Sequence, residues 1–255
     1  MNRKKEERNA LGYLLAVDTS SALLGVGLMP HYQGDRAGHI DTESEQIRSL
    51  EIDAGLGHVE RLAPAVEELL ELTGVSPGEL LALVAPRGPG SFTGLRIAVS
   101  LIKGMAAATG APIILVPTLE AYAEPLRGEQ ALVLSLLDAR QARFYVQFFR
   151  NGDYLTPALD LSPAAIAGRA ATLRAPGERI LLAGPDAGRL EGIEGIEGAS
   201  PAPLRRRSAV RGLLVRGEAA LTRGQTVAED GGPLYLRGSE AVLPRRKGAS
   251  SPRQD

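Results

Sequence analysis

Residues 14–20 read Leu14-Leu15-Ala16-Val17-Asp18-Thr19-Ser20, an apolar run that ends in an acidic residue and a polar turn, and Gly25-Val26-Gly27-Leu28 follows as a second apolar run. The same order returns 120 positions later, where Leu134-Ser135-Leu136-Leu137-Asp138-Ala139-Arg140 precedes Tyr145-Val146-Gln147-Phe148. Two short apolar runs around a polar turn predict a β-hairpin. Because the pattern recurs at a fixed offset, we expect two copies of one supersecondary unit.

The first copy continues with alternating strand and helix patterns. A helix is predicted from His58 to Thr73, because apolar residues recur there at steps of three and four and Gly74 follows as a stop signal. Leu80–Ala85 is typical of a buried strand, an apolar helix follows as far as Thr109, and Ile113–Val116 is the next strand. With a weak third strand within residues 35–50, the order is βββαβαβ, which predicts a mixed α/β unit.

The second copy has weaker patterns. Ser162-Pro163 begins a short Ala-rich helix, and Ile180–Ala183 is a predicted strand. Residues 184–203, which include the near-repeat GIEGIEG, are too glycine-rich for us to expect regular structure there. A helix over about Ser208–Thr222 and a strand at Leu234–Leu236 close the copy. We therefore expect a disordered leader at 1–12, domains at 13–122 and 123–237, with the boundary near 121–130, and a disordered basic tail at 238–255.

Composition excludes several classes of protein. The chain has 255 residues, no cysteine, 44% apolar residues and a net charge of −1, so thiol chemistry and disulfides are excluded and a strongly basic nucleic-acid binder is disfavoured. The charged leader is not followed by a complete signal peptide, and no run approaches the roughly 20 apolar residues of a membrane helix. We expect a cytoplasmic protein with no membrane contact.

Asp18 and Asp138 are the first candidates for chemistry. A carboxylate at a strand end beside Thr19 and Ser20 is placed to hold a metal-bound phosphate or to orient a water molecule. The structural alternative is a polar turn that closes a hairpin. Because both aspartates occupy the same position in a duplicated unit, the sequence leaves the two interpretations evenly balanced.

The glycine-rich turn Gly88–Gly94 is the second candidate. It lies between a strand and a helix for which Ser91 is the expected N-cap, so its amides could bind an anion. It lacks the dinucleotide fingerprint and the P-loop lysine, and its small residues also suit a close helix contact. We favour packing or partner contact, because the helix is apolar on nearly every face.

The histidine and arginine patterns add little evidence for a metal, catalytic or phosphate-binding site. His31, His39 and His58 have no zinc-ligand spacing, and Ser91 has no histidine in its motif to activate it. A solvated helix start is the favoured interpretation of the basic cluster, with phosphate contact as the alternative; the cluster consists of Arg205, Arg206, Arg207, Arg211 and Arg216.

Gly88-Pro89-Gly90-Ser91-Phe92-Thr93-Gly94-Leu95-Arg96 resembles the signature of the bacterial TsaB (YeaZ) family. Shorter matches agree with that family in order and spacing, at Leu15–Ser20, His58–Leu62, Leu137–Arg140 and Pro233–Arg237. The resemblance is firm over about residues 13–150. It implies a two-domain fold of the actin, sugar-kinase and Hsp70 ATPase type, built by duplication with the second copy reduced.

The resemblance also implies a function, that of a non-catalytic accessory subunit in forming N6-threonylcarbamoyladenosine at position 37 of ANN-decoding tRNAs. Members resemble the catalytic subunit TsaD but lack its His-x-x-x-His metal motif, and here the corresponding region has only His58. The chain would pair with TsaD, TsaE would join, and tRNA would be reached through the complex. We expect no catalytic residue, no metal and no intrinsic cofactor, with ATP or ADP bound in the complex and a homodimer when the partner is absent.

Pairing would use helices of the first domain. We expect core or interface residues at His58, Leu62, Val66, Leu69, Ser91, Phe92, Leu95, Arg96 and Val99. The alternative function is a small kinase or ATPase of the same fold, with nucleotide bound at Asp18, Thr19, Ser20 and Asp138. The missing adenosine loop and P-loop lysine count against it. A metalloprotease is disfavoured further, because the sequence has no ligand pair.

Overall fold

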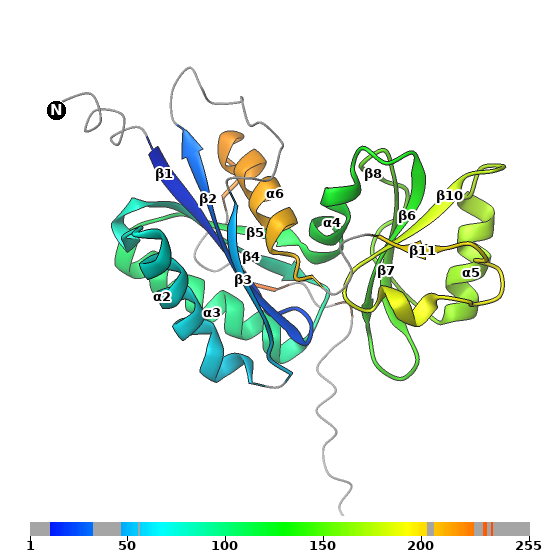
Figure 1. Ribbon diagram of the computed structural model, residues 1–255, viewed down its shortest axis with the longest axis horizontal. Helices are drawn as coiled ribbons and strands as arrows, with labels where there is room; N and C mark the ends of the chain where they lie inside the picture. The colour runs from blue at the N-terminus through cyan, green and yellow to red at the C-terminus, as the bar shows by residue number, and fades with distance from the viewer. Residues whose placement is uncertain are drawn as a thin grey trace, which may run out of the picture.

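The computed structural model describes residues 11–32, 47–55, 57–202, 207–226, 232–233 and 236. Two sheets form two lobes, joined where helix α4 lies between them (Figure 1). None of the described helices is long and apolar enough to cross a membrane.

The first sheet has five strands in the order β3-β2-β1-β4-β5. The β1–β2 pair is the predicted hairpin, antiparallel with Asp18 opposite Gly25, whereas β1 pairs with β4 and β4 with β5 in parallel. The predicted third strand exists, although most of residues 35–50 lie outside the described part of the chain. The strands are β1 (Leu11–Asp18), β2 (Leu23–Tyr32), β3 (Arg48–Asp53), β4 (Leu80–Gly88) and β5 (Ile113–Pro117).

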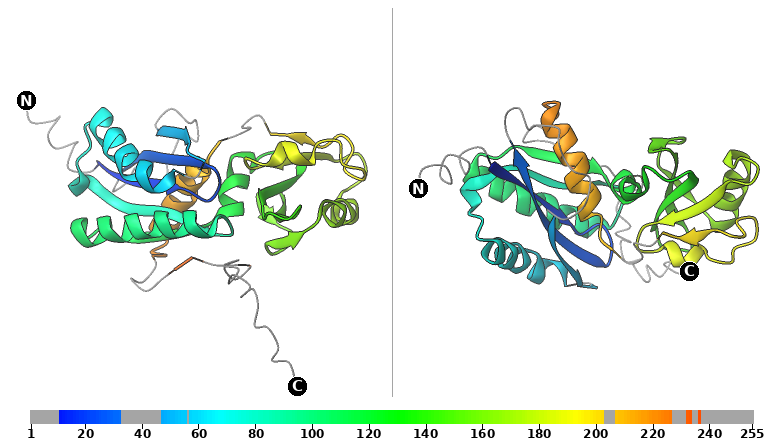
Figure 2. Two further views of the ribbon diagram at one scale, coloured as in Figure 1. Left: turned by 90° about the horizontal axis from the view of Figure 1, so that it is seen from below. Right: turned by 45° about the horizontal axis from the view of Figure 1, so that its top comes forward.

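Two helices cover one face of this sheet, α2 (His58–Thr73) and α3 (Phe92–Thr109) (Figure 2). Gly74, with φ of 67°, ends α2 in the left-handed conformation that glycine adopts at little cost. The short 3-10 turn η2 (Pro77–Glu79) then leads into β4. The apolar stripes that predicted these helices form one core cluster with the strands, which includes Leu15, Leu62 and Ile102.

The second sheet has the order β11-β10-β6-β7-β8, with β9 also paired to β7. Helix α5 (Pro163–Leu173) covers its outer face, and α4 (Thr118–Ala123) with η3 (Glu124–Leu126) packs on the inner one. The strands are β6 (Ala131–Asp138), β7 (Phe144–Arg150), β8 (Asp153–Tyr154), β9 (Leu159–Leu161), β10 (Arg179–Ala183) and β11 (Ser200–Pro201).

The predicted duplication is confirmed by matching turns. Asp18 Oδ1 accepts from the amide of Ser20 at 2.9 Å, and Asp138 Oδ1 accepts from the amide of Arg140 at 2.8 Å. The second copy is reduced, because the short turn η4 (Ala187–Leu190) follows β10 where the long helix α3 follows β4. Residues 184–203 thus contain η4 and β11, contrary to the expectation of no regular structure there.

The last described helix, α6 (Val210–Thr222), corrects the sequence-based division at residue 122. Although it belongs to the second copy in sequence, it packs on the face of the first sheet that α2 and α3 leave open, where Leu213 and Leu214 are fully buried. Hydrophobic periodicity in the sequence predicted an apolar face on α6 but could not show which sheet that face covers. Residues 234 and 235 of the last predicted strand, the leader up to residue 10 and the tail from residue 238 lie outside the described residues.

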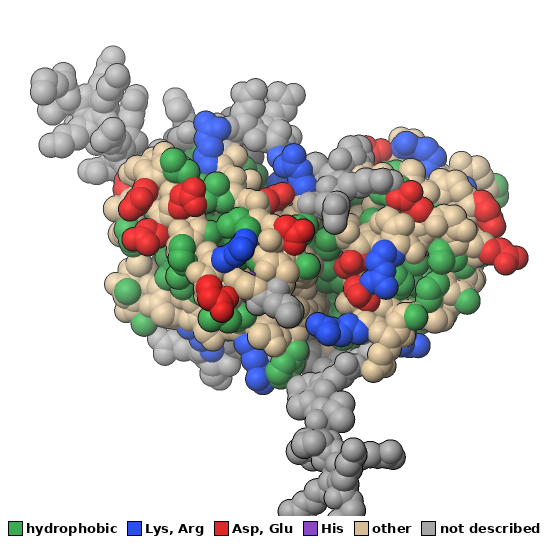
Figure 3. Space-filling model, turned by 60° about the horizontal axis from the view of Figure 1, so that its bottom comes forward, with side chains coloured by type: hydrophobic (Ala, Val, Ile, Leu, Met, Phe, Trp, Pro, Cys, Tyr) green, Lys and Arg blue, Asp and Glu red, His purple; other side chains and the backbone are tan. Residues whose placement is uncertain are grey.

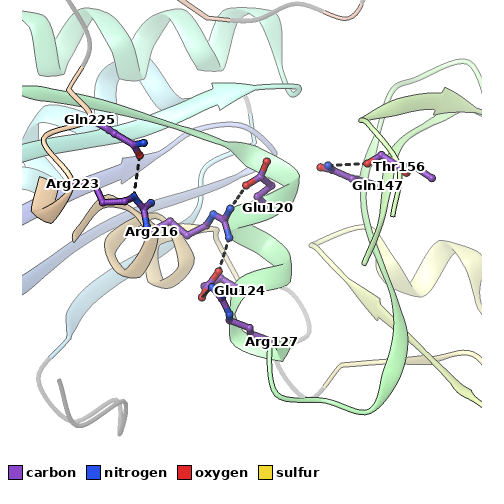
Figure 4. A network of polar contacts seen from close by, with 8 residues as sticks. All are labelled: Glu120, Glu124, Arg127, Gln147, Thr156, Arg216, Arg223 and Gln225. Carbon is purple, nitrogen blue, oxygen red and sulfur yellow. Dashed lines mark hydrogen bonds and ion pairs between the residues drawn. The ribbon is translucent and has the colours of Figure 1, made fainter. Parts of the chain in front are cut away.

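Helices α4 and α6 cross closely between the lobes. A Cβ on Gly212 would overlap the carbonyl oxygen of Ala121, so the crossing requires glycine. The Arg216 guanidinium bridges both Glu120 and Glu124, and its Nη1 lies 2.7 Å from the Glu124 carboxylate (Figure 4). The two copies therefore share a helical junction.

Candidate functional site

The turn after β1 is completely enclosed. Asp18 and Thr19 have no exposed surface and Ser20 has 2%. Besides the bond from Ser20, the Asp18 carboxylate accepts at Oδ2 from the amide of Ala209 at 2.6 Å and from the Tyr122 hydroxyl at 3.2 Å. Both oxygens are occupied, by groups from β1's own turn, α4 and the start of α6.

The Tyr122 hydroxyl is a fixed donor in this arrangement. Burial, and next the negative charge of Asp18, raise the pKa of the phenol well above its usual value. The phenol is therefore neutral at physiological pH and keeps its proton for Asp18. Since Ala209 is the N-cap of α6, the carboxylate also lies at the positive end of that helix.

The glycine-rich turn packs directly on this enclosed turn. Thr19 Oγ1 donates to the carbonyl of Gly94 at 2.6 Å, and the amide of Ser91 donates to the carbonyl of Ser20 at 2.8 Å. A Cβ on Gly94 would overlap the Thr19 carbonyl, and one on Gly90 would lie 2.8 Å from the Ser20 carbonyl oxygen. Ser91 is the predicted N-cap, with its side chain accepting from the Gly94 amide at 3.2 Å. The glycines therefore permit close backbone packing, which favours the structural interpretation over anion binding.

Asp138 has a different environment from Asp18. Its side chain is 34% exposed and pairs with Arg189 at 2.5 Å, while its amide donates to Asp186 Oδ2 at 2.9 Å. Burial, and to a lesser degree the charge of Asp138, raise the pKa of Asp186 above its usual value. The two aspartates thus match in sequence position but not in surroundings, and no contact in the described residues joins them into one site.

This chain is similar in sequence to proteins of known families. A family model described as TsaD, tRNA N6-adenosine threonylcarbamoyltransferase, matches residues 53–170. The Escherichia coli K12 tRNA threonylcarbamoyladenosine biosynthesis protein TsaB is 31% identical over 197 residues, which cover 72% of this chain and 82% of that protein. The chain belongs to the TsaB (YeaZ) family.

Other relatives support the family assignment. The Bacillus subtilis TsaB is 34% identical, but the match spans only 54% of this chain and 56% of that protein, so the chain matches about half the length of that relative. The Haemophilus influenzae TsaB, at 31% identity, is likewise matched over 51% of its length. Among solved structures, YeaZ from Pseudomonas aeruginosa superposes with a TM-score of 0.68 at 26% identity, covering 88% of this chain and all of that one. The two-sheet α/β fold of the YeaZ family is thereby confirmed.

Most residues expected at a partner interface of this TsaB-family chain lie in its core. Six of them are buried and so present little surface to a partner in this conformation; they are His58, Leu62, Val66, Leu69, Leu95 and Val99. Ser91 and Arg96 are exposed and Phe92 is half-buried, with the Arg96 guanidinium 3.9 Å from its ring centre. The hydrophobic periodicity predicted the buried stripes of α2 and α3, whereas a partner would contact the exposed faces of these helices.

The opposite faces do carry exposed apolar residues. Val59 is 63% exposed and Leu72 is 70% exposed, so neither belongs to the buried stripe of α2. We define the α2–α3 outer face by these two with Ala63, Pro64, Phe92, Arg96, Ser100, Gly104, Ala107 and Ala108, all exposed except half-buried Phe92. The signal that sequence reasoning missed is a large apolar side chain outside the buried stripe of α2, at Val59 and at Leu72.

The remaining basic and histidine candidates are dispersed. His31 Nδ1 lies 2.9 Å from Glu218 Oε1, which ties β2 to α6, and His39 lies outside the described residues. Within the described part of the chain, no three metal-binding side chains of His, Cys, Asp or Glu gather. Of the arginine cluster, Arg216 is paired with α4, Arg207 and Arg211 lie at the start of α6, and Arg205 and Arg206 are outside the described residues.

Proposed function

We propose that this chain is a non-catalytic subunit for the formation of N6-threonylcarbamoyladenosine at position 37 of ANN-decoding tRNAs, and that it pairs with TsaD. The observation that carries the proposal is the state of Asp18, whose two oxygens already accept three hydrogen bonds in a fully buried site. A carboxylate that is fully buried, with a protein donor on each oxygen, is not presented to solvent for binding a magnesium ion or activating a water molecule. This supports a scaffold over the alternative of a small kinase or ATPase.

The α2–α3 outer face supplies the proposed contact with TsaD. Apolar residues that are exposed in a monomer commonly mark a protein interface, and the small residues of α3 let another helix approach closely. Four exposed glutamates border the apolar residues on α2 and would meet basic groups of the partner; they are Glu60, Glu67, Glu68 and Glu71. Left without TsaD, the same face would pair two copies of this chain.

Figure 3 supports a protein partner over direct tRNA binding. On the face drawn there, acidic and basic side chains alternate with apolar ones, and no field of positive charge gathers. Nucleic-acid binding without such a field is disfavoured. We therefore infer that tRNA, TsaE and ATP or ADP meet this chain through the complex, in the cytoplasm.

Substitutions on the α2–α3 outer face test the proposal. We expect Val59→Glu with Leu72→Glu to abolish co-purification with TsaD and to lower reconstituted tRNA modification at least about tenfold, because two charges would be desolvated at an interface. The matched control is Tyr154→Glu, which changes a 65% exposed side chain on the second lobe. Circular dichroism checks that all variants fold.

Two results would contradict the proposal. One is full modification activity in a reaction that omits this chain. The other is micromolar binding of magnesium ATP by the isolated chain, with turnover that Asp18→Ala removes, since that result would establish the kinase or ATPase function instead.

A further inference from the structure

A cavity of about 300 Å³ lies between the two lobes; neither aspartate of the duplicated turn lines it, although Tyr122, which donates to Asp18, does. Its walls come from the β3 edge, α4 with η3, the end of β10 and the start of α6. The volume falls at the lower end of the range of ligand pockets, which suits a small molecule. The lining residues are Ile47, Ser49, Glu51, Ala121, Tyr122, Pro125, Leu126, Leu182, Ala183, Gly184, Ala202, Arg207, Ser208, Arg211 and Gly212.

Two arginines give this cavity a positive side. Arg207 is exposed and Arg211 is half-buried, and they are four residues apart at the start of α6. No hydrogen bond or ion pair joins either guanidinium to another residue of the described chain, in contrast to Arg216 one turn further on, which holds two glutamates.

The position of these arginines disfavours a purely structural role. The N-terminus of a helix carries a partial positive charge, so cations at this end are unfavourable and anions favourable. The first turn of α6 contains no acidic residue. Two nearby carboxylates are already engaged: Asp18 accepts from the Ala209 amide, and Glu51 accepts from Ser208 Oγ at 3.0 Å. The guanidiniums are therefore the free donors facing this space.

The opposite wall is apolar. Leu126 and Leu182 are buried, Ile47 is half-buried and Pro125 is exposed, and all four line the cavity. A ligand that fits both walls has one anionic group and a compact apolar body.

We propose that this cavity binds a small organic anion, a carboxylate or a phosphate ester, whose charged group is held by Arg207 and Arg211. Guanidinium groups bind either anion through paired N–H donors. The inference concerns a separate site from the α2–α3 outer face and holds or fails independently of pairing with TsaD.

Titration of the full chain by calorimetry and by NMR tests the inference. The probes are 3-methylbutanoate for the carboxylate class and glycerol 3-phosphate for the phosphate class, each up to about 10 mM at constant ionic strength. We expect at least one probe to bind, and the double variant Arg207→Gln with Arg211→Gln to weaken it about tenfold or more. The probe that binds shows whether the site takes a carboxylate or a phosphate ester.

The control is Arg223→Gln, at the exposed far end of α6, where Arg223 Nε donates to Gln225 Oε1 at 3.2 Å. Its affinity is expected to stay within about twofold of the original chain. The inference is overturned if neither probe binds, if the double variant binds as well as the original chain, or if Arg223→Gln weakens binding equally. Thermal unfolding of each variant without probe shows that folding is retained; should the double variant fail to fold, Arg211→Lys replaces it, with the same loss expected because lysine lacks the paired donors.

Discussion

At the scale of single residues, the Asp18 carboxylate is the point where three distant segments meet. It accepts hydrogen bonds from its own turn, from Tyr122 in α4 and from the amide of Ala209 before α6. A buried charge of this kind is tolerable only because every oxygen has donors and a helix end faces it. Through these bonds the carboxylate links the end of β1 to α4 and to the start of α6.

Tyr122 gives a pH-dependent prediction. Because the pKa of its phenol is raised in the folded state, the unfolded chain releases this proton near pH 10 while the folded chain retains it. This contribution to the free energy of unfolding is complete below pH 10 and falls by about 1.4 kcal/mol per pH unit above it, until the pH reaches the folded-state pKa.

Tyr122→Phe separates this effect from general alkaline unfolding. At pH 7 we expect a loss of about 1–2 kcal/mol, because Asp18 Oδ2 loses one donor, whereas above pH 10 the gap between variant and original should narrow. Urea titrations across pH 7–11 measure both. The control is Tyr154→Phe, at an exposed tyrosine, and a gap that widens with pH would refute the interpretation.

At the scale of elements, the crossing of α4 and α6 determines how the two lobes are joined. Glycine at position 212 brings the helix backbones together, and Arg216 adds its pairs to Glu120 and Glu124 on the flank (Figure 4). Partly buried ion pairs add modest stability and considerable geometric specificity. The close backbone contact at Gly212 is therefore the part of this crossing that another side chain can least replace.

Gly212→Ala tests that crossing. The new methyl group would overlap the Ala121 carbonyl, so we expect a loss of about 1–3 kcal/mol despite the better helix propensity of alanine. Gly168→Ala in α5 is the matched control: open space surrounds a Cβ there, so a gain of up to about 1 kcal/mol is expected. Chemical denaturation of both variants provides the comparison, and equal gains would show that the crossing is loose.

At the scale of the whole molecule, the first sheet depends on a helix from the far end of the chain. One face is covered by α2 and α3, and the other by α6 and α4 (Figures 1 and 2). Without α6, the apolar residues Leu14, Ala16, Met29 and Val84 would be exposed on that face. The first lobe is thus a structural unit that is not contiguous in sequence, since it includes α6, whereas the strands of the second lobe follow one another along the chain.

A truncation experiment follows from this arrangement. We expect a fragment of residues 11–122 to bind a hydrophobic dye and to unfold without cooperativity, because an uncovered apolar sheet face favours a loosely packed state. A fragment of residues 11–226, which retains α6, is expected to show a sharp thermal transition. Cooperative unfolding of the shorter fragment would restore residues 13–122 as an independent domain.

Local patterns in the sequence determined the elements and their repetition. The two hairpins with aspartate at the strand end, the helix from His58 to Thr73 and the Ser91 N-cap all follow from neighbours within a few residues, as do the turn hydrogen bonds of Asp18 and Asp138. Hydrophobic period and capping are local properties, so one sequence suffices to predict them. The nine-residue signature at Gly88–Arg96 likewise indicated the family.

Only the tertiary structure decided how these elements are used. The sequence could not show that Asp18 is sealed by Tyr122 and Ala209, that Leu62 and Leu95 are core while Val59 and Leu72 are exposed, or that α6 covers the first sheet. The sealing of Asp18 depends on contacts between residues about 100 to 200 positions apart, and the burial of Leu62 depends on packing between separate elements. In both, burial of apolar surface favours the arrangement that leaves the least of it exposed. An apolar stripe predicts that a face is buried, and only packing determines what buries it.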